Sequence, residues 1–268
     1  MTLQPDVPVE RLVDGPQPAL AAALGLAAVE YRFRTTSTMD VAHGLAEQGA
    51  PSGTLVIASV QEAGRGRGGK IWASEADAGL WCTLVERPSD PRALDVLAVR
   101  VGLTLAAALT PFVRDAIQLK WPNDLLVSGG KLVGILIEVR WRDGHPEWVA
   151  IGVGINRRVP AGFPSAAHVR PGVTREVLLH AVIPALRSAA AHRGLLNGDE
   201  RAAWDARDCW RGHRMVGPVA GVVQGIAADG AVLIADDSGV VHPVRSGSLV
   251  PADGDVPGRS AGPDTAFR

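Results

Sequence analysis

Cysteine is scarce in this chain, which has only Cys82 and Cys209 among its 268 residues. Two cysteines so far apart cannot form the dense disulfide framework that stabilises many small secreted domains. We therefore expect a protein of the reducing cytoplasm. The seven histidines are scattered without the spacing of metal ligands, so the sequence predicts no certain metal site. A G-x-S-x-G element is also missing, so nothing supports a hydrolase nucleophile elbow.

Net charge and long apolar runs are also lacking. The 27 Lys and Arg residues nearly balance the 28 Asp and Glu residues, giving a net charge of -1. Such a balance offers no overall attraction for nucleic acid or for an acidic membrane surface, and we expect neither partner. The longest early apolar stretch, Ala19 to Val29, is about half of the roughly 20 residues that a membrane-spanning helix needs. Acidic residues precede it, whereas a signal peptide begins with positive charge.

The composition that remains is globular, with 47% hydrophobic and 21% charged residues. The length suits one large domain, or a medium domain followed by a small one. Apolar periodicity and turn residues predict helices over 18–30, 37–49, 174–195 and 200–210, a long helix that begins near Pro91, and strands over 31–36, 54–60 and 80–86.

Three further strands are predicted in quick succession, over 117–127, 131–141 and 147–156. The connections between them are only a few residues long. A parallel crossover needs a dozen residues or more, so these strands must be antiparallel neighbours. The sequence therefore excludes a purely parallel, doubly wound sheet.

The residue composition of the chain changes at Gly212. From there, short valine- and isoleucine-rich runs separated by Gly, Asp and Ser predict a small all-β barrel. The residues from Asp253 onward have little to bury and are expected to be disordered. We therefore predict an N-terminal segment with a packed helix (1–35), a main domain (36–211), a small barrel (212–252) and a tail (253–268).

The loop from Gly64 to Lys70 carries most of the functional information. It reads Gly-Arg-Gly-Arg-Gly-Gly-Lys, so it offers close backbone approach and three cations for a phosphate or carboxylate. A dinucleotide fingerprint would need a crossover helix directly after it, and residues 71–79 are too short and irregular. A P-loop would need a hydroxyl where Ile71 stands. A flexible basic surface loop remains as the simplest alternative.

Several motifs, taken in order, resemble those of biotin protein ligases. The loop with Trp72 is similar to the family's G-R-G-R-x-G-R-x-W. The resemblance extends over roughly residues 32 to 250 through these elements: Ser37-Thr38-Met39, Lys120-Trp-Pro-Asn-Asp124, Lys131-Leu-Val-Gly-Ile-Leu-Ile-Glu138 and Gly152-Val-Gly-Ile-Asn156. Each element alone is weak evidence, but the ordered set is specific.

The resemblance implies an α+β fold. Residues 36–211 would form a catalytic domain that binds biotin and ATP, with a mixed, largely antiparallel sheet and flanking helices like that of class II aminoacyl-tRNA synthetases, and an SH3-like barrel would follow it. It also implies two half-reactions. Biotin and ATP, with Mg²⁺, give biotinoyl-AMP and pyrophosphate, and the biotin is then transferred to a lysine of the biotin carboxyl carrier domain of an acyl-CoA carboxylase. Pro5, Pro8, Pro16 and Pro18 leave no room for a winged helix-turn-helix ahead of Ser37, so we expect the monofunctional form. A monomer is favoured over a homodimer.

The same resemblance assigns site residues. Lys131 and Arg67 are the expected catalytic residues, because fixed cations stabilise charge that builds at the α-phosphorus. The expected biotin-binding residues are Ser37, Thr38, Met39, Gln61, Gly64, Arg65, Gly66, Arg67, Trp72, Lys131, Gly134 and Gly152. The expected nucleotide-binding residues are Arg67, Lys70, Asn123, Asp124, Lys131 and Asn156. Of these, Asn123, Asp124 and Asn156 are also expected near any magnesium.

Each assignment has a simpler alternative. Lys131 could be a solvated hairpin lysine, Asn123-Asp124 a turn, and Trp72 and Trp121 core residues. Lys70 stands where the family motif usually has arginine, which keeps the charge but loses the bidentate fork. At the level of function, a lipoate ligase and a non-catalytic adenylate-binding module remain as rivals.

Overall fold

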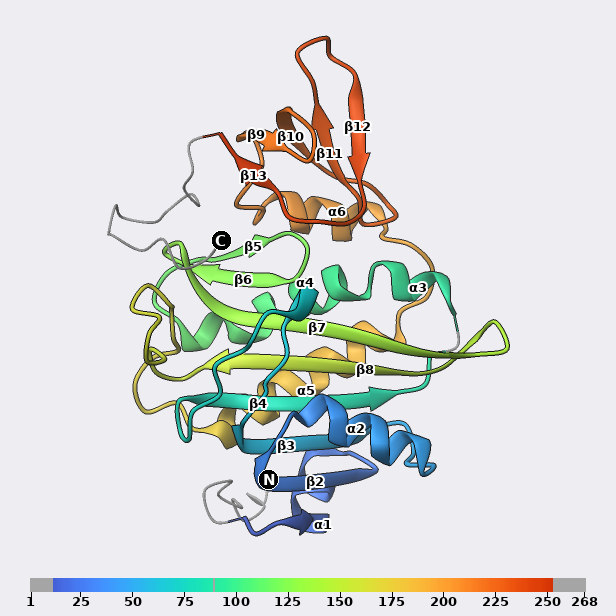
Figure 1. Cartoon of the computed structure of the whole chain (residues 1–268), viewed down its shortest axis with the longest axis vertical. Helices are drawn as coiled ribbons and strands as arrows, with labels where there is room; N and C mark the ends of the chain where they lie inside the picture. Colours follow the sequence, from blue (N-terminus) through green and yellow to red (C-terminus); the bar gives the residue numbers. More distant parts are fainter. Residues whose placement is uncertain (1–11, 89, 253–268) are drawn as a thin grey trace.

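The computed structural model describes residues 12–88 and 90–252, which form two β-sheets with helices packed around them (Figure 1). The larger sheet has eight strands in the order β1-β2-β3-β4-β8-β7-β6-β5. Its strands are β1 (Gly15–Pro16), β2 (Ala28–Thr35), β3 (Thr54–Gln61), β4 (Gly79–Glu86), β5 (Ile117–Lys120), β6 (Asp124–Val127), β7 (Gly130–Arg142) and β8 (His145–Asn156). Only β2 and β3 pair in parallel. The predicted α+β fold with a mixed, largely antiparallel sheet is confirmed.

Helices cover both faces of this sheet. The α-helices of the described chain are α1 (Pro18–Leu24), α2 (Thr38–Glu47), α3 (Arg92–Asp95), α4 (Leu97–Leu109), α5 (Arg175–Ala191) and α6 (Gly198–Asp205). In Figure 1, α2 lies in front of the sheet, while α4 and α5 lie behind it. The buried clusters show the same arrangement. On one face, α2 forms a small buried cluster with Val56, Val85 and Trp148, whereas α4 and α5 contribute to the main core on the other face.

Helix α2 begins where the sequence indicates. Ser37 has extended backbone angles and its hydroxyl accepts a hydrogen bond from the Met39 N–H at 3.3 Å, as an N-cap should. Asp40 accepts from the Thr36 hydroxyl at 3.3 Å and forms an ion pair with Arg65 at 2.8 Å. The N-cap therefore presents Ser37 and Thr38 at the sheet face, and Asp40 engages the glycine-rich loop.

Two of the predicted elements are wrong in extent. The helix predicted over 18–30 ends at Gly25, whose φ of 63° is left-handed, and Ala28 to Glu30 belong to β2. The strand predicted over 117–127 is a hairpin, because Pro122 has no N–H to donate and residues 121–123 turn the chain between β5 and β6. The tryptophan-proline-asparagine run is therefore a turn at one end of the sheet.

The predicted helices are also longer than those observed. The long helix near Pro91 is broken at Val96, whose angles of -110° and 4° separate α3 from α4. α5 spans Arg175–Ala191 with Pro184 inside it, and α6 ends before the predicted limit of residue 210. Beyond α6 the chain extends along β5, where Leu119 N–H donates to Arg207 and Cys209 N–H donates to Leu119.

The smaller sheet is antiparallel, with the strand order β12-β11-β10-β9-β13. Its strands are β9 (Arg214–Gly217), β10 (Gly221–Ile226), β11 (Val232–Ala235), β12 (Val241–Val244) and β13 (Val250–Pro251). Ile226, Val232 and Ile234 belong to the same buried cluster as the large sheet, so both sheets share one core. The SH3-like character of this sheet and the domain limits at 35/36 and 211/212 stay predictions, and the proposed tail lies outside the described residues.

The structure also bears on the two cysteines and on the apolar runs of the sequence. Cys82 and Cys209 are both free and buried. Across 12–88 and 90–252, no helix has the length and apolar character needed to cross a membrane.

Candidate functional site

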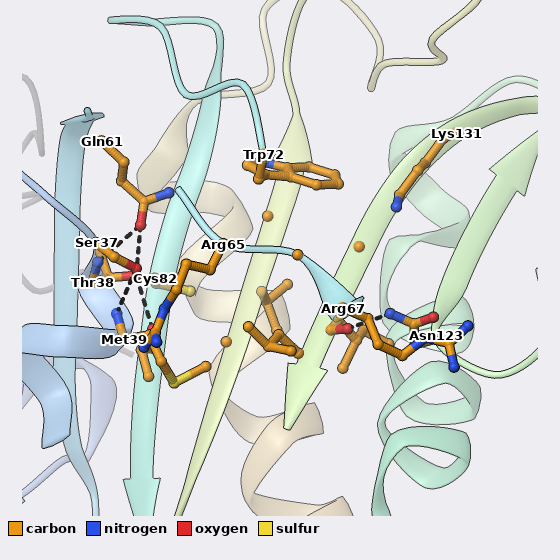
Figure 2. Close-up of a pocket in the computed structure, with 18 residues that line it drawn as sticks. Ser37, Thr38, Met39, Gln61, Arg65, Arg67, Trp72, Cys82, Asn123 and Lys131 are labelled. Carbon is orange, nitrogen blue, oxygen red and sulfur yellow. Dashed lines mark hydrogen bonds between the residues drawn. The ribbon is translucent and has the colours of Figure 1, made fainter. Parts of the chain in front are cut away.

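A small cavity lies on the front face of the large sheet, between the start of α2, the strands β7 and β8, and the glycine-rich loop (Figure 2). Its volume is about 50 Å³, whereas small-molecule sites usually offer about 300–1,000 Å³. Side chains over the cavity must therefore move to admit an organic ligand. Most of the predicted site residues line it: Ser37, Thr38, Met39, Gln61, Arg65, Gly66, Arg67, Trp72, Asn123, Lys131, Gly134 and Gly152.

The remaining predicted residues, Gly64, Lys70, Asp124 and Asn156, do not line the cavity. Asp124 reaches it through Lys131, whose Nζ is 2.8 Å from Asp124 Oδ1. The Asn156 amide donates to the Lys131 carbonyl at 3.0 Å, and its own buried oxygen has no partner among the described residues. Gly64 is buried behind Trp72, and Lys70 is exposed and does not line the cavity.

One end of the cavity is polar. Gln61 Oε1 accepts from the N–H and the hydroxyl of Thr38 at 2.8 and 3.1 Å, and its Nε2 donates to Ser74 Oγ at 2.7 Å. The Thr38 hydroxyl also lies 2.8 Å from that of Thr83. Ser74 and Thr83 were missed by sequence reasoning, because nothing in their spacing marks them out from other residues of a loop and a strand.

Another wall of the cavity is aromatic and lies on a stripe of glycine. Gly134 on β7 and Gly154 on β8 are register partners. A Cβ atom on either one would lie 2.5 Å from the Trp72 ring, and a Cβ on Gly152 would lie 2.7 Å from Met39 Cε. Only glycine therefore lets the Trp72 indole lie close to the sheet. Gly154, like Cys82, Ile135, Leu136 and Val153, lines the cavity without having been predicted to do so.

Three cations converge on the cavity, and each already has protein partners. Arg65 Nη2 is 2.8 Å from Asp40 and 3.3 Å from Glu138. Lys131 Nζ lies 4.8 Å from the centroid of the Trp72 ring in addition to its contact with Asp124. Arg67 Nη2 donates to the carbonyl of Gly247 at 2.6 Å. These contacts hold planar and point-like donors at fixed positions, which is what recognition of an anion requires.

Burial shifts the pKa of Cys82, which lines the cavity, and of Lys120 at the end of β5. Burial raises the pKa of the Cys82 thiol to about 12, so it stays protonated at neutral pH. Burial also lowers the pKa of Lys120, whose Nζ lies 5.5 Å from the Trp210 ring. Within the described residues, no group of three or more His, Cys, Asp and Glu side chains could hold a metal ion.

The loop conformation bears on the two rival motifs. Residues 65 and 71 form an isolated bridge, Gly66 N–H donates to the Lys70 carbonyl at 2.7 Å, and Arg67–Gly69 form a short 3₁₀ turn. The described residues 71–78, between this loop and β4, contain no helix. A dinucleotide fingerprint and a P-loop both need that helix, so both readings are excluded.

The comparisons with known proteins agree with the motifs. The model of the Biotin/lipoate A/B protein ligase family matches residues 31–156. The bifunctional ligase/repressor BirA of Bacillus subtilis is 40% identical over 142 residues, which cover 50% of this chain and 42% of that protein. The biotin–[acetyl-CoA-carboxylase] ligase of Paracoccus denitrificans is 35% identical over 231 residues, which cover 77% of this chain and 93% of that one. The chain thus spans about two fifths of the Bacillus protein and nearly all of the Paracoccus protein.

A solved structure shares the fold. The biotin protein ligase of Aquifex aeolicus, in complex with biotin and ATP, superimposes with a TM-score of 0.65 at 23% identity. The match covers 83% of this chain and 97% of the Aquifex chain. At this identity the likeness establishes the arrangement of the large mixed sheet and its flanking helices.

Proposed function

This chain belongs to the biotin/lipoate A/B protein ligase family, and on that premise we propose that it is a biotin protein ligase. A carboxylate oxygen of biotin attacks the α-phosphorus of ATP, and the bond to the pyrophosphate oxygen breaks. The amine of a carrier-domain lysine then attacks the acyl carbon of biotinoyl-AMP, forming an amide as AMP leaves and the amine loses a proton. The single observation that supports this most directly is one cavity with a polar end and three converging cations.

The polar end suits the ureido ring of biotin. That ring presents a carbonyl acceptor and N–H donors in fixed positions, and it needs partners for both. Thr38, Gln61 and Thr83 offer hydroxyl and amide groups that serve as donors and acceptors. The dithiolane ring of lipoate has no such hydrogen-bonding groups, so it would leave buried polar groups unpaired, at a cost of about 1–3 kcal/mol each. This favours biotin over lipoate.

The three cations suit a carboxylate beside a triphosphate. Arg65 and Arg67 have planar forks for carboxylate and phosphate oxygens, and Lys131 supplies a compact charge between them. Fixed donors stabilise the charge that develops at the phosphorus without reorganising during the reaction. In this proposal Asn123 and Asn156 contact the nucleotide or support its contacts, and the aromatic wall of Trp72 excludes water from the adenylate.

Magnesium would accompany the triphosphate. Mg²⁺ usually keeps several waters and is held by one or two carboxylates together with substrate phosphates. Asp124 is a carboxylate at the edge of the cavity, and Asn156 Oδ1 is a buried oxygen with no partner in the described structure. These two oxygens fit that mode, and the bound ion would neutralise phosphate charge.

Pyrophosphate release from ATP tests the proposal. The protein should release pyrophosphate when biotin is present and not when lipoate replaces it. Equal rates with both acids would favour a lipoate ligase, and no release with either would favour a non-catalytic adenylate-binding module. Transfer of biotin to a purified biotin carboxyl carrier domain, followed by mass spectrometry, tests the second step and the partner separately.

A further inference from the structure

The loop between β12 and β13 holds a residue of the candidate site. Arg67 Nη2 donates to the Gly247 carbonyl at 2.6 Å and lies 3.3 Å from Ser248 Oγ, although these residues are about 180 positions away in the chain. We propose that Gly247 and Ser248 are positioning residues for Arg67, so that the smaller sheet sets the affinity of the site for the phosphates of ATP. This inference rests on the proposed function. The two contacts are called the Arg67 tether below.

The glycine-rich loop cannot hold Arg67 by itself. Arg67 is flanked by Gly66, Gly68 and Gly69, and the φ angles of the last two are 68° and 75°. Glycine has the largest conformational freedom to lose on ordering, and it has no side chain that could pack beside the guanidinium. The carbonyl of Gly247 therefore gives Arg67 a support that the loop lacks.

The β12–β13 loop is itself well anchored. Val244 and Leu249, on either side of it, are buried in the main core. Arg245 pairs with Asp229 at 2.8 Å, and the neighbouring Gly230 carbonyl accepts from Trp121 Nε1 at 3.0 Å. Since Trp121 lies in the turn between β5 and β6, the tether connects Arg67 to the large sheet by a second, rigid route.

The geometry of the guanidinium leaves it free to act on a ligand. Both tether contacts use Nη2, and within the described part of the chain Nε and Nη1 of Arg67 donate to no protein atom. Arginine has five N–H donors in one plane. Fixing one corner of that plane therefore orients the remaining donors, and Arg67 lines the cavity at the same time.

The backbone of Gly247 provides a specific test. Its φ is +103°, a conformation that disfavours side chains, and an added Cβ would meet no atom within 4 Å. Gly247→Ala should therefore rotate the peptide and withdraw the carbonyl without causing a clash. Gly239, in the turn between β11 and β12, is a matched control with a φ of +83° and equally open space.

The experiment compares pyrophosphate release by Gly247→Ala, Ser248→Ala and Gly239→Ala. Loss of the tether should raise the KM for ATP by about tenfold in Gly247→Ala, consistent with the loss of a charge-assisted hydrogen bond. Ser248→Ala should have a smaller effect in the same direction, and Gly239→Ala should match the wild type. The affinity for biotin without ATP should change by less than about threefold, well under the effect of one such bond.

A double-mutant cycle separates positioning from general damage. In an Arg67→Ala background, Gly247→Ala should add no further loss, because the group that it positions is absent. The proposal is overturned if Gly247→Ala and Gly239→Ala have the same KM for ATP, or if Gly247→Ala costs as much without Arg67 as with it. If Gly247→Ala does not fold, Ser248→Ala in the same cycle decides.

Limited trypsin digestion gives a readout that does not require catalysis. A tethered Arg67 side chain cannot enter the specificity pocket of trypsin, so cleavage after Arg67 should be several-fold faster in Gly247→Ala than in Gly239→Ala. This result would establish the tether even if the wild type released no pyrophosphate, in which case only the proposed function would fail. Equal cleavage in both variants would overturn the tether.

Discussion

Thr38 and Gln61 are joined through a single oxygen atom, because Gln61 Oε1 accepts from both the N–H and the hydroxyl of Thr38. A carboxamide has two acceptor lone pairs and two N–H donors. The acceptor side of Gln61 is therefore filled, and one donor is taken by Ser74. Gln61 can offer one N–H to a ligand, and its larger role is to hold Thr38 against the cavity.

Gln61→Glu should weaken biotin binding by roughly tenfold or more, the cost of a lost buried donor. The carboxylate keeps the acceptor for Thr38 but has no donor for Ser74 or for the ureido carbonyl. Isothermal titration calorimetry of biotin binding measures the effect. Gln48→Glu, on the exposed end of α2, is the control and should bind biotin like the wild type. Unchanged affinity in Gln61→Glu would mean that the amide donors are dispensable.

Lys131→Ala should lower the rate of adenylation by about 10²-fold or more, as for the loss of other transition-state donors. Transfer from supplied biotinoyl-AMP should suffer less, since that step no longer needs charge between carboxylate and α-phosphate. Lys70→Ala offers a contrast, because Lys70 is exposed and outside the cavity. Its effect should be much smaller. Rapid-quench measurement of the two half-reactions checks this prediction. If Lys131→Ala adenylated biotin at the wild-type rate, Lys131 would have no catalytic role and would only be part of the hairpin.

The parts of the fold that depend on local pattern were predictable. Short connections after residue 127 required antiparallel strands, and Ser37 marked the start of α2. The residues at which helices and strands begin and end were predicted less well. Apolar residues continue from α1 into β2, so periodicity alone could not show that Gly25 stops the helix. Pro122 was the available signal that 117–127 is a hairpin, since proline cannot donate within a strand ladder.

The candidate site also has a part that the sequence could predict and a part that it could not. The motifs contain most of the residues that line the cavity, because the start of α2, the glycine-rich loop, and strands β7 and β8 meet at the same face of the large sheet. They could not identify pairs that the tertiary fold creates. Gln61 meets Ser74 across a loop, and Arg67 meets Gly247 from another sheet. Such contacts depend on packing between distant segments, for which one sequence has no periodic signal.

Gly154→Ala should disrupt ligand binding while leaving the fold intact. The added Cβ would lie 2.5 Å from the Trp72 ring, so the indole must lift from the sheet. We expect biotin affinity to fall by about tenfold or more, a loss of about 1.4 kcal/mol, because the displaced indole no longer forms the wall of the cavity. Gly154→Ala combined with Trp72→Ala should be no worse than Trp72→Ala alone, because the clash is gone. Additive losses would show that Gly154 acts through another contact.

Gly44→Ala is the control for this substitution. Gly44 lies in α2, and an added Cβ would meet no atom within 4 Å. Alanine is favoured over glycine within a helix by about 0.5–1 kcal/mol, so this variant should be slightly more stable than the wild type. Calorimetric unfolding of both variants, measured beside biotin titrations, separates a loss of binding from a loss of fold.

Asp208 should make the stability of the protein depend on pH. It follows α6, where its Oδ1 accepts from the Trp210 N–H at 2.9 Å and its Oδ2 has no partner among the described residues. Burial raises the pKa of its carboxyl to about 6. An unfolded aspartate has a pKa near 3.9, so the folded protein holds this proton more tightly. The resulting stabilisation is complete below about pH 4 and is lost as the pH rises through about 6.

Asp208→Asn keeps the acceptor for Trp210 and removes the buried charge. Relative to the wild type, Asp208→Asn should be more stable at pH 7.5 than at pH 4, with a free energy of unfolding larger by on the order of 1–3 kcal/mol. Asp90 provides a control of opposite sign, because hydrogen bonds from the Gly194 and Arg92 N–H groups lower the pKa of its carboxyl. Asp90→Asn should therefore lose stability at pH 7.5 and recover relative to the wild type as the pH falls. Urea unfolding at both pH values measures these differences. If Asp208→Asn shifts stability equally at pH 4 and pH 7.5, its effect comes from packing, and Asp208 does not titrate between them.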